Sequence, residues 1–119
     1  MQQLSPAEAA LVATIDPAPM LSQVQTWSAI NTGTRNLAGL AAQAEALAAA
    51  LAALPGAIEL VEGTPVEAVG ADGTVQALAH GRHLVFRVRA QAARRLLLTG
   101  HMDTVFAADH PFQRCVWNG

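Results

Sequence analysis

Two side chains suited to metal chemistry, His101 and Asp103, stand two positions apart directly after an apolar run. The run, Leu96-Leu97-Leu98-Thr99-Gly100, is short and ends at a glycine. Such a run predicts a strand that is covered on both faces. Residues that follow a strand of this kind emerge at its end, which is where α/β proteins place their chemistry.

The chemistry that this pair suggests is zinc ligation. A catalytic zinc site takes about three protein ligands and keeps one position open for water. His101 offers a nitrogen ligand, and Asp103 projects to the same side of an extended chain. The Asp103 carboxylate is placed to accept the other imidazole N–H, a contact that fixes the tautomer of a metal-bound histidine. On spacing alone, a loop histidine hydrogen-bonded to a nearby aspartate explains the same pattern.

The remaining polar candidates are weaker. His110 lies in the same loop as the pair and is able to reach a metal or substrate, but a solvent-exposed loop histidine is the simpler interpretation. His80 and His83 flank a glycine-containing turn, which favours a surface turn over a metal site. Cys115 has only Arg114 as a basic neighbour, so we do not expect a catalytic thiol.

Helices are expected in the first half of the chain. Ser5-Pro6-Ala7-Glu8 forms a capping box with proline at the first helical position. Asp16 is a cap for a second helix, and Thr34 or Asn36, in a polar loop, is a cap for a third. Leucines spaced by three and four then predict a helix that packs on a sheet. The expected helices span residues 6–15, 17–27 and 37–54.

The second half changes to strand periodicity. Residues 70–73, Gly-Ala-Asp-Gly, predict a hairpin turn. The expected strands span 57–62, 66–69, 74–79, 83–90 and 95–100, with the last antiparallel to its predecessor. Together these elements predict one α/β domain over residues 1–119, a mixed sheet with the N-terminal helices packed on it. His101 would then lie at the end of a central strand.

Composition excludes several classes of protein. Apolar residues make up 52% of the chain, which argues against disorder. The net charge of −2 and the lack of a basic stripe argue against nucleic acid or an anionic membrane as a partner. The single cysteine fits a reducing compartment, and no signal peptide or membrane span is evident. A cytoplasmic protein is therefore expected.

The surroundings of the pair resemble a known family. The run from Leu96 to Val105 is similar to the first metal-binding signature of the zinc-dependent carboxypeptidase G / aminoacylase / succinyl-diaminopimelate desuccinylase metallopeptidases. The run from Trp27 to Leu40 resembles the loop before the long N-terminal helix of that family. Val105-Phe106 and Asp109-His110-Pro111-Phe112 resemble the segment after the signature in carboxypeptidase G-like members. The likeness spans essentially the whole chain in order.

This resemblance implies a di-zinc hydrolase with a zinc-exopeptidase-like catalytic domain, which cleaves an amide bond in a small peptide or N-acyl amino acid. His101 matches the first zinc ligand of the family. Asp103 matches the catalytic-site acid that supports this histidine without binding metal. The chain lacks counterparts of the bridging Asp segment, the Glu-Glu pair, the further carboxylate and the distant His of the family.

The missing parts imply the N-terminal fragment of a catalytic domain. Alone, such a fragment is expected to be inactive and at best a weak zinc binder, because two ions need the full ligand set. The family commonly adds a smaller domain with dimer contacts, which this chain lacks. Apolar surface exposed by truncation would favour association into a homo-oligomer. The alternative is a degenerate, non-catalytic α/β interaction module. A nucleotide-binding domain would need a glycine-rich turn between strand and helix, which is not found.

Overall fold

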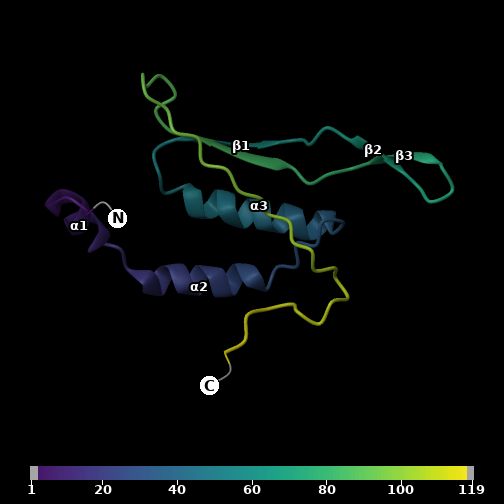
Figure 1. Cartoon of the computed structure of the whole chain (residues 1–119), viewed down its shortest axis with the longest axis horizontal. Coiled ribbons are helices and arrows are strands. Elements are labelled where there is room, and N and C mark those ends of the chain that lie inside the picture. Colours follow the sequence, from purple (N-terminus) through teal and green to yellow (C-terminus); the bar gives the residue numbers. More distant parts are fainter. Residues whose placement is uncertain (1–2, 118–119) are drawn as a thin grey trace.

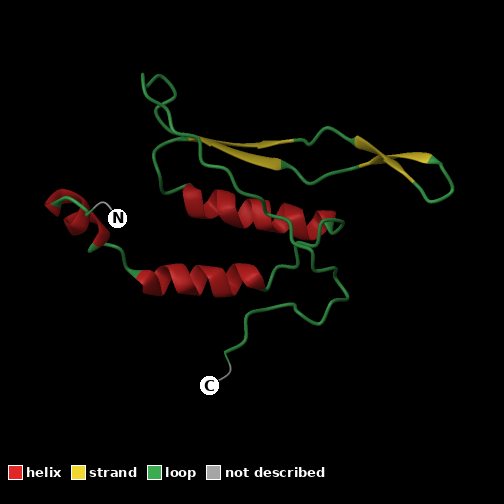
Figure 2. Ribbon diagram, viewed as in Figure 1, coloured by secondary structure: helices red, strands yellow, loops and turns green. Residues whose placement is uncertain are grey.

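The computed structural model describes residues 3–117, in which three helices precede four strands (Figures 1 and 2). The protein therefore mixes helices with small antiparallel sheets, as its periodicity predicts. The elements are α1 (Pro6–Val12), α2 (Pro17–Ser28), α3 (Leu37–Leu51), β1 (Ala57–Val61), β2 (Val66–Val69), β3 (Val75–Leu78) and β4 (His83–Arg87).

Each helix begins where its cap predicts. The Ser5 hydroxyl accepts the Glu8 amide at 3.3 Å, and the Glu8 carboxylate accepts the Ser5 amide at 2.7 Å, which completes the capping box. The Asp16 carboxylate caps α2 by accepting the Ala18 amide. Asn36, rather than Thr34, caps α3. α1 and α3 end at Val12 and Leu51, about one turn short of their predicted ends, because their last turns are irregular.

The strands form a long antiparallel ribbon that is interrupted in its middle (Figure 2). β1 pairs with β4 from Ala57↔Arg87 to Val61↔His83, and β2 pairs with β3 around the predicted hairpin turn. Gly73 adopts a φ of 82° in that turn, a conformation that glycine tolerates without strain. The interruption lies at residues 62–65 and 79–82, where Pro65 has no amide hydrogen to pair.

Two predictions about the sheet are wrong. The described strands pair only in antiparallel fashion, in two separate two-stranded sheets, and do not form one mixed sheet. Residues 95–100 form no strand, and β4 pairs with β1 instead. His101 therefore does not follow a central strand. The apolar run marks a segment able to form a buried strand, but pairing also needs neighbouring strands, which residues 3–117 do not supply.

Only α3 packs on the ribbon, against β1 and β4 (Figure 1). Leu40 and Ala44 of α3 are the only buried hydrophobic residues in the described part of the chain. The expectation that all N-terminal helices cover the sheet is wrong, since α1 and α2 bury no residue. Both helices have exposed apolar side chains, and the described chain contacts α2 only near its end, where the Cys115 amide donates to the Ser28 hydroxyl at 3.1 Å. None of the helices in residues 3–117 is long and apolar enough to cross a membrane.

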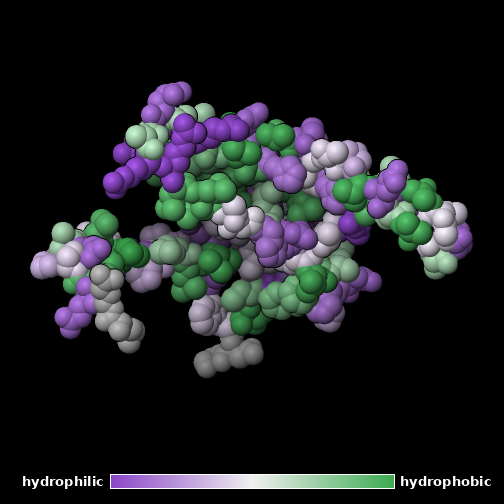
Figure 3. Space-filling view, turned by 45° about the horizontal axis from the view of Figure 1, so that its top comes forward, coloured by the Kyte–Doolittle hydropathy of each residue, from purple (hydrophilic) through white to green (hydrophobic). Residues whose placement is uncertain are grey.

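The molecule exposes far more surface than a compact domain of its mass. Its accessible area is 9812 Å², whereas a compact monomer of this size exposes about 6100 Å². Hydrophobic residues lie at the surface along the length of the face drawn in Figure 3. The fold thus leaves much apolar surface without a partner.

Candidate functional site

The loop between α2 and α3 holds the segment that contains His101 and Asp103. The Thr104 amide donates to the Thr32 carbonyl at 2.8 Å, and the Thr34 amide donates to the Thr104 carbonyl at 3.1 Å. These bonds form an isolated parallel bridge between Gly33 and Thr104. The pair is therefore positioned by the residue that follows it, and not by a strand that precedes it.

Asn31 is the centre of this attachment. Its side chain is half-buried, and its amide nitrogen faces three acceptors while its amide oxygen faces two donors. The acceptors are the carbonyl oxygens of Phe106 and Ala107, both at 3.2 Å, and the side-chain oxygen of Gln113 at 3.0 Å; the donors are the Gly33 amide and the Asn36 side chain. The sequence indicated only a polar turn here. The three acceptors of Asn31 lie more than seventy residues away, so the local sequence pattern carries no signal of them.

The His101 imidazole is oriented by two oxygens of Asp103. Its Nδ1 lies 2.8 Å from the main-chain carbonyl oxygen and 3.2 Å from carboxylate Oδ1. A carbonyl oxygen only accepts, so Nδ1 holds the proton and the neutral ring has its lone pair on Nε2. The side chain is 84% exposed. This tautomer and exposure suit Nε2 to metal ligation, and the nearer orienting atom is the carbonyl rather than the expected carboxylate.

Asp103 has an electrostatic environment that favours its charged form. The Thr34 hydroxyl donates to carboxylate Oδ2 at 2.9 Å, and this bond is the main cause that lowers the Asp103 pKa. Partial burial opposes the shift, while the hydrogen bond and charge of His101 add to it. A lowered pKa means that the charged Asp103 carboxylate stabilises the fold at pH values above the ordinary pKa of an aspartate. That contribution is lost as pH falls through the lowered folded-state pKa.

The substitution Thr34→Val should raise the Asp103 pKa toward its ordinary value, because it removes the hydroxyl that donates to Oδ2. Carboxyl-carbon NMR titration measures this directly. Thr74→Val is the matched control, since the Thr74 hydroxyl donates to Asp72 at 2.7 Å and lowers the pKa of that carboxyl instead. An Asp103 titration curve that is unchanged by Thr34→Val would contradict the assignment.

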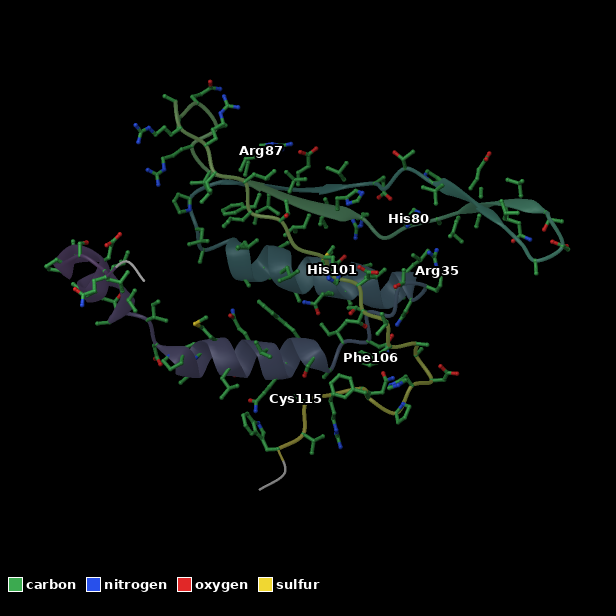
Figure 4. The ribbon with its side chains drawn as sticks, viewed as in Figure 1. Arg35, His80, Arg87, His101, Phe106 and Cys115 are labelled. Atoms are coloured by element: carbon green, nitrogen blue, oxygen red, sulfur yellow. The ribbon has the colours of Figure 1, made fainter. Side chains whose placement is uncertain are left out.

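A cavity of about 630 Å³ lies beside the pair. It is lined by His101 and Asp103, by residues 80–84 at the ribbon interruption, and by Leu40 and Leu47 of α3. In Figure 4, His101 lies over the middle of α3, while His80 and Arg35 lie toward the end at which α3 begins. His80 and His83 thus line the same cavity as His101, whereas the sequence suggested an unrelated surface turn. Counting residues outward from the hairpin turn would have placed 79–82 opposite 62–65 and revealed the break.

The ribbon wall also contains an unsatisfied polar atom. His80 Nε2 is buried and has no hydrogen-bond partner within the described residues. Arg82 makes one long contact, 3.4 Å to the Glu45 carboxylate, and its side chain is 31% exposed. The ribbon side of the cavity is thus lined by polar side chains, while the α3 residues that line it, Leu40 and Leu47, are apolar.

The donor set fits one metal ligand but not a complete metal site. Across residues 3–117, no three His, Cys, Asp or Glu side chains gather closely enough to hold an ion. His110 packs its ring on Phe106 at 4.9 Å, and its Nδ1 accepts the Phe112 amide at 3.0 Å. Its neutral tautomer is therefore opposite to that of His101. Cys115 is exposed.

Comparison of this chain with protein-family models, curated proteins and solved structures finds no match. The family resemblance is therefore an expectation that rests on residues 27–40 and 96–112.

Proposed function

We propose that this chain contributes one zinc ligand, His101, and its positioning acid, Asp103, to a di-zinc amidohydrolase. The enzyme would be of the carboxypeptidase G / aminoacylase / succinyl-diaminopimelate desuccinylase type. The observation that supports this most is the Nδ1 contact of 2.8 Å, which leaves Nε2 as the ligand atom. When bound, zinc would polarise the amide carbonyl and activate water. Further ligands would have to lie outside residues 3–117 or on another chain.

The cavity supports a small substrate of mixed character, such as a short peptide or an N-acyl amino acid. Its volume of about 630 Å³ falls in the roughly 300–1000 Å³ range of small-molecule sites. Leu40 and Leu47 would contact an apolar group, and Arg82 has donors left for a carboxylate because it makes a single long contact. We place this activity in the cytoplasm, consistent with the single exposed cysteine.

Zinc titration followed by histidine NMR tests the ligand assignment. Before zinc is added, long-range proton–nitrogen spectra above the histidine pKa should show protonated Nδ1 in His101 and protonated Nε2 in His110. Zinc should then shift His101 Nε2 first. Zinc binding by the isolated chain should have a dissociation constant weaker than about micromolar, because one imidazole supplies only a small part of the ligand set of a structural zinc site.

His110→Ala is the matched control, since it removes an exposed imidazole of the opposite tautomer and should leave zinc binding unchanged. His101→Ala should abolish the response. Equal perturbation of all four histidines would contradict the proposal. Micromolar or tighter binding that His101→Ala removes would show a more complete site than the one described.

A non-catalytic interaction module is the second candidate. It is favoured by α1 and α2, which bury no residue although both present apolar side chains. The reading frame beyond Gly119 separates the two candidates. A downstream Asp segment and a Glu-Glu pair would support the enzyme, and a stop codon there would support the module.

A further inference from the structure

The segment from Arg95 to Asp103 is an unpaired, extended stretch of chain. It contains no turn or bend. From Leu96 to Met102, no backbone amide or carbonyl takes part in a hydrogen bond to another described residue. Leu96, Leu97 and Leu98 are 85%, 84% and 83% exposed. These leucines are more exposed than any other leucine of the described chain.

Such a segment has two unmet requirements. Successive side chains of an extended chain point to opposite faces, so the three leucines make both faces apolar. Its backbone groups also form a free edge, which is a template for pairing with another strand. A partner has to satisfy the edge and cover at least one face.

The charges at its ends select the partner. Arg94 and Arg95 precede the leucines, and Asp103 follows them, with a neutral stretch between. In an antiparallel pair of identical segments whose two-fold axis passes through Thr99, Arg95 of each copy lies across from Asp103 of the other. Symmetry makes this opposite-charge pair twice. Parallel pairing in register would stack like charges instead.

We propose that residues 95–103 are a strand-pairing surface for a second copy of this chain, with the two copies antiparallel about a two-fold axis. The inference is independent of zinc chemistry, because it uses the backbone edge, the leucines and the terminal charges. The chain also has enough exposed surface to supply such an interface. The exposed 9812 Å² exceeds the compact value of about 6100 Å² by several times the 600–1000 Å² that each partner gives to a stable interface.

The oligomeric state of the whole chain tests the proposal. Light scattering during gel filtration should give twice the 12.4 kDa chain mass at high concentration and the single mass on dilution. Amide hydrogen exchange at residues 96–102 should slow as the dimer forms. Leu97→Pro should raise the dimer dissociation constant by roughly tenfold or more, because proline removes an amide hydrogen and clashes in a paired strand.

Val105→Pro is the matched control. Val105 is 89% exposed and lies just outside the paired segment, so its replacement should leave the dimer intact. Far-UV circular dichroism of each variant checks that the fold survives. Both side chains are exposed and neither belongs to the Leu40–Ala44 core, so neither variant should unfold the protein.

Charge reversal separates this register from non-specific association. Arg94→Glu with Arg95→Glu should weaken the dimer, and adding Asp103→Arg should restore it by recreating opposite charges across the pair. A monomer at all concentrations, or open-ended assembly of rising mass, would overturn the proposal. A dimer that survives Leu97→Pro but is lost on Leu21→Asp would also overturn it, because the contact would then lie on α2. Binding to neutral vesicles in place of dimerisation would overturn it as well.

Discussion

Replacing Gly39 with alanine will lower the free energy of unfolding by about 2 kcal/mol or more, as overpacking against fixed backbone does. A Cβ at this position would overlap the Asn31 carbonyl oxygen and lie 2.7 Å from the Asn36 side-chain nitrogen. Glycine-to-alanine changes within a helix normally stabilise by about 0.5–1 kcal/mol. The expected sign is therefore the reverse of the helix propensity.

Urea denaturation followed by circular dichroism measures this effect. Gly100→Ala is the control, because a Cβ at Gly100 meets nothing within 4 Å. We expect the urea midpoint of Gly100→Ala to match that of the wild type. A Gly39→Ala protein as stable as the wild type would mean that the α2–α3 loop moves away from α3 without cost, and that the loop does not hold residues 103–107 rigidly.

The second large effect is expected for Asn31→Asp. The change keeps the shape of the side chain but replaces its donor nitrogen with an oxygen that faces the Phe106, Ala107 and Gln113 acceptors. Each unsatisfied, part-buried polar group costs about 1–3 kcal/mol. We therefore expect a loss of about 2 kcal/mol or more, together with release of residues 104–113 from the loop.

Hydrogen exchange of the Thr104 amide reports the release, because this amide donates to the Thr32 carbonyl at 2.8 Å in the intact protein. Its exchange should accelerate in Asn31→Asp. Gln76→Glu on exposed β3 makes a comparable amide-to-acid change and should leave both stability and exchange as they are. Unchanged exchange of Thr104 in Asn31→Asp would show that the backbone bridge alone holds the segment.

Local chemistry accounts for the elements that sequence reasoning predicted correctly. The capping box at Ser5, the Asp16 cap and the glycine-containing hairpin turn each act within a few residues, so their signals are complete in the local sequence. The pairing of β1 with β4 joins residues far apart in the chain. The apolar run 95–100 was predicted as the partner of β4, although the register that the hairpin turn sets also places β1 opposite β4.

The candidate site divides in the same way. His101 and Asp103 were identified from sequence because they are two residues apart and their orienting contact is local. The contributions of Asn31 and Thr34 depend on contacts across about seventy residues, and only the folded chain reveals them. The same holds for His80 and His83, which reach the cavity through the break in the ribbon.

The sequence by itself thus determined the helix starts, the hairpin and the histidine–aspartate pair, because short-range hydrogen bonding and periodicity decide these features. Tertiary structure alone decided that α1 and α2 bury no residue, and that the leucine run of residues 96–98 forms no strand. It also decided that the α2–α3 loop holds the site. Burial and strand pairing depend on residues that are distant in sequence. An apolar pattern shows that a segment can be buried, but it does not show which segment covers it.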